Sequence, residues 1–340
     1  MRRTAHRALV GLAAFLIVLA VASRLILLPR VERAPIDEYA TTVAVAQNAQ
    51  YFDAASGTVK TQATLTATRT IRGDVKASSG DVAVWDSFLR IENPDEATPL
   101  VRATTDRVAF DRKTSRAVNG YGEAVDGKPV RHNGIEYRFP FDVSKTKTYD
   151  YYDTVVEQAY PMTYKATEKV KGLVTYRFEQ QVPATKTGTL PVPGVFVGNQ
   201  THPLDLFTLD RYYADVRTVW VEPRTGAIVL GQEREQQTLR QPGSSKDVFT
   251  LFDATFRYND KTIANRVSYA KDARRTLALV GSLGPIVELI LGVLALALGM
   301  VLGRRTGSAA SIVLPDSGPL RSAPRPRSMA DPVTDHEPTR

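Results

Sequence analysis

Two short segments combine tyrosines with charged side chains in a way that suits binding of a sugar ring. Aromatic faces can stack on a sugar while carboxylates and guanidinium groups hydrogen-bond to its hydroxyls. Core tyrosines beside carboxylates at strand ends give the same pattern, and this structural interpretation is the commoner one. The segments therefore become ligand-binding candidates only where they are exposed and close together. They are Tyr149-Asp150-Tyr151-Tyr152-Asp153 and Asp210-Arg211-Tyr212-Tyr213.

The sequence lacks the familiar catalytic motifs. It contains no G-x-S-x-G nucleophile elbow, H-E-x-x-H zinc helix, phosphate-binding P-loop or EF-hand loop. It also contains no cysteine, which excludes disulfides, thiol nucleophiles and cysteine-held metal centres. Only His132 and His202 lie in the central region. We therefore predict a non-enzymatic protein, with no catalytic residue, cofactor or metal ligand assigned.

One enzymatic alternative remains open, a hydrolase of envelope carbohydrate that uses two carboxylates. The distance between such carboxylates is spatial and cannot be obtained from sequence. Asp150 and Asp153 are its candidates.

The composition is that of a globular chain with few candidate partners. Of 340 residues, 43% are hydrophobic and 24% are charged, which excludes a disordered chain and a polytopic transporter. The net charge is +8, but basic and acidic residues alternate along most of the chain. Because nucleic-acid binding favours a concentrated basic patch, we expect no nucleic-acid partner.

An apolar segment over residues 8–28 follows three arginines near the N-terminus. Its length matches a membrane-spanning helix, and Arg24 near its outer end can extend to the lipid headgroups. A cleaved signal peptide is the alternative, because Ala20-Val21-Ala22 suits a peptidase. We favour a retained anchor, since the apolar character resumes at once over residues 25–28.

A second apolar segment covers residues 277–303. Pro285 suits the first turn of its membrane helix, which would place Glu288 near the helix N-terminus, where a carboxylate is tolerated. Small residues recur at four-residue spacing and allow close approach of another helix, with the first anchor as the obvious partner. They are Ala295, Gly299 and Gly303.

The charges predict a topology with both termini in the cytoplasm. The arginines before the first span favour a cytoplasmic N-terminus, residues 1–7, and two spans return the chain to the same side. Residues 304–340 are rich in Pro, Ser, Gly and Arg and predict a disordered cytoplasmic tail. Residues 29–276 then form an extracytoplasmic domain.

This central domain is predicted to be mainly β. Runs such as residues 64–71 and 248–256 alternate with period two and are separated by Gly-, Asn- and Pro-containing turns. We expect antiparallel hairpins in a sandwich or barrel-like arrangement, flanked by two transmembrane α-helices. The clearest hairpin covers residues 219–229, and residues 110–118 repeat part of its turn pattern. A duplicated β unit and recurring turn chemistry are both open explanations.

Several motifs together resemble one family. They are Arg30 to Asp37, Ala83-Val84-Trp85-Asp86, Val108-Ala109-Phe110-Asp111-Arg112, Phe139-Pro140-Phe141, Tyr176-Arg177-Phe178, Val192-Pro193-Gly194, Arg211-Tyr212-Tyr213 and Trp220 to Gly226. As a set, they resemble the actinobacterial PorA-type porin family, which also carries a domain-of-unknown-function label. The resemblance implies a two-helix cell-envelope protein and no catalytic residues.

The sequence departs from a pore-forming barrel. Such barrels need strands of about ten residues with an uninterrupted lipid-facing apolar stripe, and they have no helical spans. Here charges such as Arg69, Arg177 and Asp253 interrupt the alternating runs. We therefore expect a binding or scaffold domain for envelope lipid or glycan, anchored in the bilayer and able to form homo-oligomers through its membrane helices. A pore component is the alternative.

Overall fold

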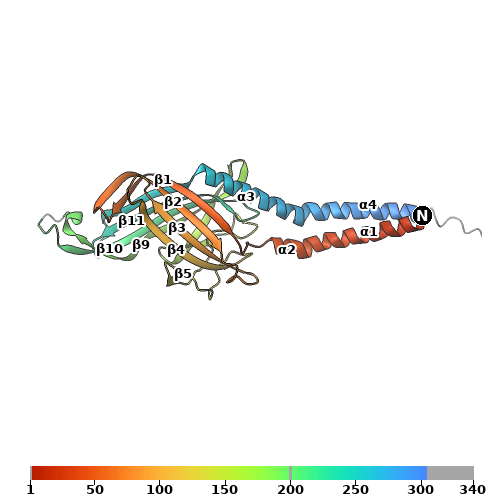
Figure 1. The fold of residues 1–340 in the computed structure, drawn as a ribbon, viewed down its shortest axis with the longest axis horizontal. Helices are drawn as coiled ribbons and strands as arrows, with labels where there is room; N and C mark the ends of the chain where they lie inside the picture. Colours follow the sequence, from red (N-terminus) through yellow and green to blue (C-terminus); the bar gives the residue numbers. More distant parts are fainter. Residues whose placement is uncertain (1, 199–200, 305–340) are drawn as a thin grey trace, which may run out of the picture.

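The computed structural model describes residues 2–198 and 201–304 as a curved β-sheet from which two helices project at one end (Figure 1). The strands are β1 (Tyr39–Asp53), β2 (Thr58–Gly73), β3 (Val82–Glu92), β4 (Leu100–Asp111), β5 (Ala124–Val125), β6 (Lys128–Pro129), β7 (Tyr149–Asp153), β8 (Gln158–Val170), β9 (Leu173–Pro193), β10 (Leu206–Val221), β11 (Ile228–Arg240) and β12 (Asp247–Tyr258). A 3-10 turn, η2 (Gly194–Val197), follows β9.

All twelve strands belong to one sheet with the order β6-β5-β4-β3-β2-β1-β12-β11-β10-β9-β8-β7. Each neighbouring pair is antiparallel, so the chain forms two successive six-strand meanders that join where β1 pairs with β12. The predicted fold class, a mainly β domain flanked by two helices, is confirmed. The sequence left a sandwich and a barrel-like arrangement open, and the structure has a single open, curved sheet.

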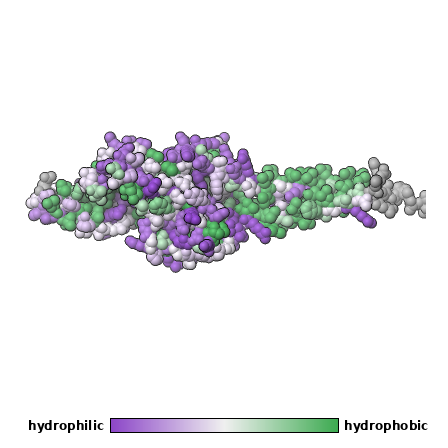
Figure 2. All heavy atoms as spheres, in the orientation of Figure 1, coloured by the Kyte–Doolittle hydropathy of each residue, from purple (hydrophilic) through white to green (hydrophobic). Residues whose placement is uncertain are grey.

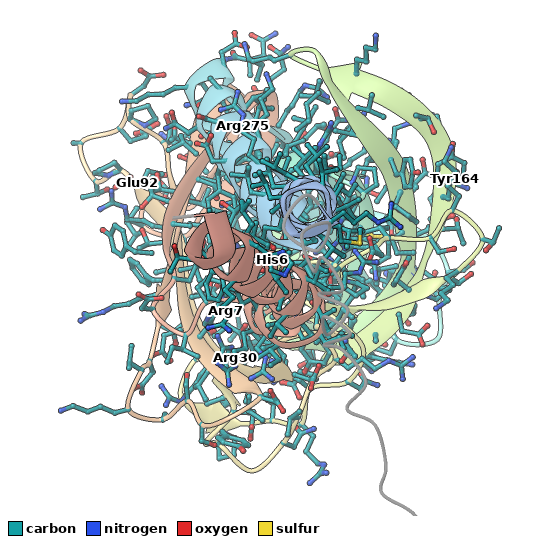
Figure 3. All side chains as sticks on the ribbon, turned by 90° about the vertical axis from the view of Figure 1, so that its right-hand side faces the viewer. His6, Arg7, Arg30, Glu92, Tyr164 and Arg275 are labelled. Atoms are coloured by element: carbon teal, nitrogen blue, oxygen red, sulfur yellow. The ribbon has the colours of Figure 1, made fainter. Side chains whose placement is uncertain are left out.

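The sheet is strongly curved, and its concave face encloses the interior. On β2, Leu65 and Ala67 are buried, as the period-two pattern predicts. Strands far apart in the sheet order approach each other across the concave side: Arg102 of β4 forms an ion pair with Glu235 of β11. Figure 3 looks along the helices and shows the sheet on both sides of them, with Glu92 and Tyr164 on opposite sides. The right-handed twist of β-strands favours this coiling.

Two turns share one hydrogen-bond pattern and follow corresponding strands of the two meanders. After β10, a carboxylate oxygen of Glu222 accepts from the amide of Thr225 at 2.8 Å and from its hydroxyl at 2.7 Å. After β4, Asp111 accepts in the same way from the amide and hydroxyl of Thr114, at 2.7 and 2.8 Å. The repeated sequence pattern therefore corresponds to a repeated local structure.

These two turns meet at the backbone of Phe139. The next residue in each has a positive φ, Ser115 at 59° and Gly226 at 71°. The Ser115 hydroxyl donates to the carbonyl of Phe139 at 3.0 Å, and the amide of Phe139 donates to the carbonyl of Gly226 at 2.9 Å. A Cβ at position 226 would lie 2.1 Å from the Phe139 carbonyl oxygen, so only glycine fits there.

The N-terminal helical segment consists of α1 (Arg2–Ala22), the π-helical turn η1 (Ser23–Leu27) and α2 (Leu28–Val31). The C-terminal one consists of α3 (Asp260–Ala278), the π-helical turn η3 (Leu279–Leu283) and α4 (Gly284–Arg304). Both segments are long and apolar enough to cross a membrane. Figure 2 shows hydrophobic residues covering the projecting helices, whereas the sheet domain is mostly hydrophilic.

The C-terminal helical segment begins earlier than the expected boundary at residue 277. It starts at Asp260, where the side chain of Asn259 caps the helix by accepting from the Thr262 amide at 2.9 Å. Its first part packs on the sheet, where Ile263, Val267 and Ala270 join a cluster with Trp220. Pro285 lies in the first turn of α4, as expected, and directly follows the π-helical turn, which accommodates its missing amide donor.

The two projecting helical segments lie side by side (Figure 1), and glycines of α4 face α1. A Cβ at Gly299 would lie 3.3 Å from the Leu9 side chain, and one at Gly303 would lie 3.0 Å from the His6 ring. Gly292, which the sequence analysis did not single out, is packed in the same way against Ile17. Ala295 is half-buried on the same helix.

The polar residues of these segments pair with each other. The hydroxyl of Ser23 donates to Glu288 at 3.5 Å, and the guanidinium of Arg24 donates to the carbonyl of Gly281. The Ser23–Glu288 and Arg24–Gly281 hydrogen bonds therefore join the two helical segments. The predicted cytoplasmic tail after Arg304 lies outside the described residues.

Candidate functional site

The concave face of the sheet holds a cavity of about 330 Å³. This volume is at the lower end of the range found for small-molecule sites. Strands from both meanders, helix α3, the segment before β1 and residues 136–141 enclose it. The cavity also contacts Val31 and Leu277, which lie close to the point where the two helical segments leave the sheet.

The wall of the cavity is mixed in character. Small and apolar side chains from β1, β2, β3 and β12 line it together with six arginines and four glutamates. The apolar members used below are Ala44, Ala67, Leu89, Ile91 and Phe256. An apolar wall with a few convergent polar groups is typical of a site for an organic ligand.

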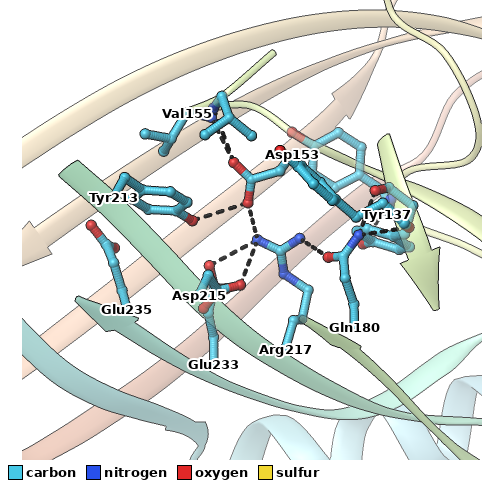
Figure 4. Close-up of polar contacts among 12 residues, drawn as sticks. Tyr137, Asp153, Val155, Gln180, Tyr213, Asp215, Arg217, Glu233 and Glu235 are labelled. Atoms are coloured by element: carbon cyan, nitrogen blue, oxygen red, sulfur yellow. Dashed lines mark hydrogen bonds and ion pairs between the residues drawn. The ribbon is translucent and has the colours of Figure 1, made fainter. Parts of the chain in front are cut away.

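The centre of the polar wall is Arg217 of β10, shown in Figure 4. Its guanidinium donates to Gln180 at 2.9 Å, to Glu233 at 2.9 Å and to Asp153 at 3.1 Å. Asp215 lies 3.4 Å from Nη2, the nitrogen that donates to Glu233 and Asp153. One cation is thus surrounded by three carboxylates, which is an excess of negative charge for a buried position.

This excess changes the protonation behaviour of Asp215. Burial raises the pKa of its carboxyl well above the ordinary value, and the negative charge of Glu233 adds to the effect. Burial would also raise the pKa of Glu233, but Arg217, Arg69 and Arg102 together more than offset it and the net shift is downward. Both Asp215 oxygens are buried and make no hydrogen bond among the described residues. Asp215 therefore retains a proton more readily than Glu233 does.

Two further arginines extend the polar wall across the cavity. Arg102 donates to both carboxylate oxygens of Glu235, at 2.5 and 2.6 Å. This bidentate geometry is the strongest arrangement of an arginine with a carboxylate. Arg69 of β2 donates to the hydroxyls of Tyr137 and Ser87, each at 3.2 Å. The polar groups of this wall are thus already hydrogen-bonded to other side chains.

Near the helices the cavity contains a second group of charges. Arg138 is buried and donates to the backbone carbonyls of Arg112 and Thr225 at 3.2 and 3.0 Å. Burial lowers its pKa to about 10. Burial likewise raises the pKa of Glu38, an effect that Arg266 opposes from 3.9 Å. The charges here are spaced more loosely than around Arg217.

The structure brings the two tyrosine-rich segments together, but in the interior. The hydroxyl of Tyr213 donates to Asp153 at 3.0 Å, and both residues are buried. Tyr151 and Tyr152 line the cavity, whereas Tyr149 packs into the core against Phe139.

The remaining candidates of these segments lie elsewhere. Arg211 is exposed and donates to Gln237 at 3.0 Å, and Tyr212 stacks under the guanidinium of Arg240. Asp150 is exposed, whereas all hydrogen bonds of Asp153 are directed inward to Tyr213, Arg217 and the backbone. A pair of carboxylates on either side of one substrate bond is therefore not formed by Asp150 and Asp153.

Sequence reasoning missed most of the charged residues of the cavity. They are Glu38, Arg69, Arg102, Glu136, Arg138, Arg217, Glu233, Glu235 and Arg266. Their signal was present: on β2, Arg69 continues the inward-facing series of Leu65 and Ala67. A charge at an inward-facing position of a strand indicates a polar interior site. Arg69 is therefore more than an interruption of an apolar stripe.

Comparison with known proteins places the chain in a family. The family model described as Porin PorA matches residues 7–301. The chain belongs to the Porin PorA family. It is 29% identical over 281 residues to Porin PorA of Corynebacterium resistens, covering 61% of this chain and 68% of that protein. It is 26% identical over 265 residues to Porin PorA of Corynebacterium amycolatum, covering 64% of this chain and 68% of that protein.

The match includes both helical segments and the whole sheet, and it confirms the resemblance seen in the sequence motifs. Membership in the PorA family and two apolar helices agree with a membrane protein.

Proposed function

We propose that this PorA-family chain is a membrane-anchored, non-catalytic protein of the cell envelope that binds an amphiphilic envelope lipid in its concave cavity. The observation that carries the proposal is the composition of the cavity. A hydrogen-bonded polar wall around Arg217 lies within the same space as the apolar wall of Ala67, Ile91 and Phe256. An amphiphile matches both parts.

The position of the cavity supports a lipid over a free sugar. The space extends to Val31 and Leu277, beside the apolar helices that can enter a bilayer. A lipid bound there would have its polar group near Arg217 and its apolar part against Ala67, Ile91 and Phe256. Transfer of apolar chains from water into such a wall is favourable by about 0.8 kcal/mol for each buried CH₂ group.

The same proposal includes the topology. Both termini are placed in the cytoplasm and the sheet outside it, because arginines precede the first span. The chain has no native cysteine, so single cysteines introduced at Arg7 or at the exposed Tyr39 can test this orientation. An impermeant maleimide added to intact cells should label only the cysteine at position 39.

Lipid binding is tested by purifying the full-length protein in a mild detergent and identifying retained lipids by mass spectrometry. Ala44→Trp fills the cavity and should lower the retained lipid by about tenfold, which equals about 1.4 kcal/mol. Ala103→Trp on exposed β4 is the matched control and should retain the lipid. Equal retention by the two variants, or no lipid in the unsubstituted protein, would contradict the proposal.

A pore is the second candidate, because both relatives carry the name Porin PorA. Since the sheet is open and carries charges on its strands, such a pore would have to involve the helices, for example in a homo-oligomer. The glycine face of α4 is already occupied by α1, so this oligomer would use other helix faces. The test is single-channel conductance in planar bilayers. Conductance by the full-length protein that is lost when the helices are altered would favour the pore.

A further inference from the structure

Three side chains of metal-ligand type converge beside the cavity although they are distant in sequence. Asp106 lies on β4, and His132 and Glu136 lie between β6 and β7. The Nε2 atom of His132 is 3.0 Å from a carboxylate oxygen of Asp106 and 3.7 Å from one of Glu136. One ligand atom from each residue lies within 4.8 Å of the others.

The cluster is buried and incompletely hydrogen-bonded. The exposed fractions of the three side chains are 3% for Asp106, 0% for His132 and 7% for Glu136. The Oε2 atom of Glu136, which faces the imidazole, makes no hydrogen bond among the described residues. Two buried carboxylates this close together are unfavourable unless a cation or a proton compensates their charge.

The spacing of the ligand atoms agrees with a small divalent cation. Zinc binds imidazole nitrogen and carboxylate oxygen at about 2.0–2.2 Å, which separates tetrahedral ligands by about 3.4 Å. The two distances to His132 Nε2, 3.0 and 3.7 Å, lie on either side of this separation. Two of the three separations thus lie within about 0.4 Å of the tetrahedral value, and the third, between Asp106 and Glu136, is at most 4.8 Å.

Neighbouring groups hold two of the three ligands in place. The Tyr137 hydroxyl donates at 2.5 Å to the Asp106 oxygen that does not face the imidazole. The side chain of Asn119 bonds both backbone groups of His132, at 2.9 and 3.0 Å. Such outer contacts orient the ligands in known metal sites.

We propose that Asp106, His132 and Glu136 bind one divalent cation of the zinc class. Mixed imidazole and carboxylate ligands favour a first-row transition metal over calcium or magnesium, which prefer oxygen alone. Glu136 and Tyr137 also line the cavity, so the cation is accessible there and a water can provide a fourth ligand.

The bound cation crosslinks two parts of the sheet domain. It joins β4 to residues 130–148, a segment between β6 and β7 that contains no strand. Closing a long irregular segment through a metal stabilises the folded state, because the unfolded chain loses more freedom than the folded one. In a chain without cysteine, this cation replaces the disulfide that other extracytoplasmic domains use.

The test uses full-length protein in mild detergent, treated with a chelator and then supplied with zinc chloride alone. We expect one zinc per chain to resist dialysis and to raise the unfolding temperature measured by circular dichroism. Glu136→Gln keeps the size of the side chain but removes the charge, and it should weaken zinc binding by at least about tenfold. His202→Gln removes an exposed histidine of the same domain and should leave binding unchanged.

A second variant, His132→Gln, should abolish the visible absorption of bound cobalt(II). If His132→Gln does not fold, Glu136→Gln with an unchanged circular dichroism spectrum decides the question alone. Equal zinc affinity in Glu136→Gln and the unsubstituted protein would overturn the site. So would an unfolding temperature that zinc does not change, which would mean that Asp106 and Glu136 share a proton.

Discussion

The guanidinium of Arg102 forms two parallel hydrogen bonds with the carboxylate of Glu235, although four strands of the sheet separate β4 from β11. This pair is direct evidence of the curvature, because strands so far apart in a flat sheet could not touch. It also crosses the cavity and fixes its width. The same contact thus contributes to both the fold and the candidate site.

Breaking this pair on one side should be strongly destabilising. In Arg102→Met, the Glu235 carboxylate stays buried without its cation, and we expect a loss of about 3–5 kcal/mol in the free energy of unfolding. The double variant Arg102→Met with Glu235→Leu removes both charges and should recover most of the loss. Urea unfolding followed by circular dichroism measures both. A double variant no better than the single one would contradict this assignment.

Gly226 should tolerate alanine far less than another turn glycine does. Both Gly226 and Gly243 have a positive φ, at 71° and 80°, but only the former lies against backbone atoms. Gly243→Ala should cost about 1 kcal/mol for its backbone conformation alone. Gly226→Ala should cost at least about 2 kcal/mol more, because its Cβ would overlap the Phe139 carbonyl. Similar unfolding temperatures for the two variants would show that the Phe139 backbone moves aside.

The stability of the domain should depend on pH through Asp215. Burial raises its pKa in the folded state, so the folded protein binds this proton more tightly than the unfolded chain does. The contribution of Asp215 is therefore most favourable at low pH. It is lost as pH rises from about 4, the ordinary value for aspartate, through the raised pKa.

Asp215→Asn removes this titration. The fall in unfolding free energy with rising pH should be shallower in Asp215→Asn than in the unsubstituted protein. Asp150→Asn, at the exposed position of β7, is the control and should keep the original slope. Denaturant titrations across a series of pH values provide the comparison, and identical slopes in all three proteins would contradict the prediction.

Close packing of the two helical segments should depend on Gly299. Leucine at this position must displace Leu9 and Val10, which lie 3.3 and 3.4 Å from the added Cβ. A Cβ added at Gly11 on α1 has no packing contact within 4 Å, so leucine at this position is the matched control. We expect Gly299→Leu to lower the unfolding temperature in detergent and Gly11→Leu to leave it nearly unchanged, because helix contacts in lipid rely on small residues. Equal effects would indicate that the helices separate freely.

The sequence predicted the elements well because their signals are local. The period-two alternation of residues 64–71 marks β2, and the Pro-Arg-Thr-Gly turn marks the hairpin of β10 and β11. The two apolar segments were equally clear from length and composition. Each of these signals depends on residues within one element.

The site was not predictable in the same way, because its residues come together only through the curvature of the sheet. Arg102 and Glu235 are distant in sequence, and no periodicity relates them. Asp106 and His132 were likewise unconnected in the sequence, since an isolated histidine carries no spacing signal. The start of α3 was missed for a different reason: its polar outer residues hide the continuity with the apolar span.

The elements α3, η3 and α4 form one continuous helical segment, which fixes the orientation of the sheet domain relative to α4. Because α3 packs on the sheet and α4 follows it without an intervening loop, a change in the tilt of α4 is transmitted to the sheet domain that holds the cavity. A helix longer than the local hydrocarbon thickness responds by tilting. A change in membrane thickness that tilts α4 would therefore tilt the whole sheet domain relative to the bilayer.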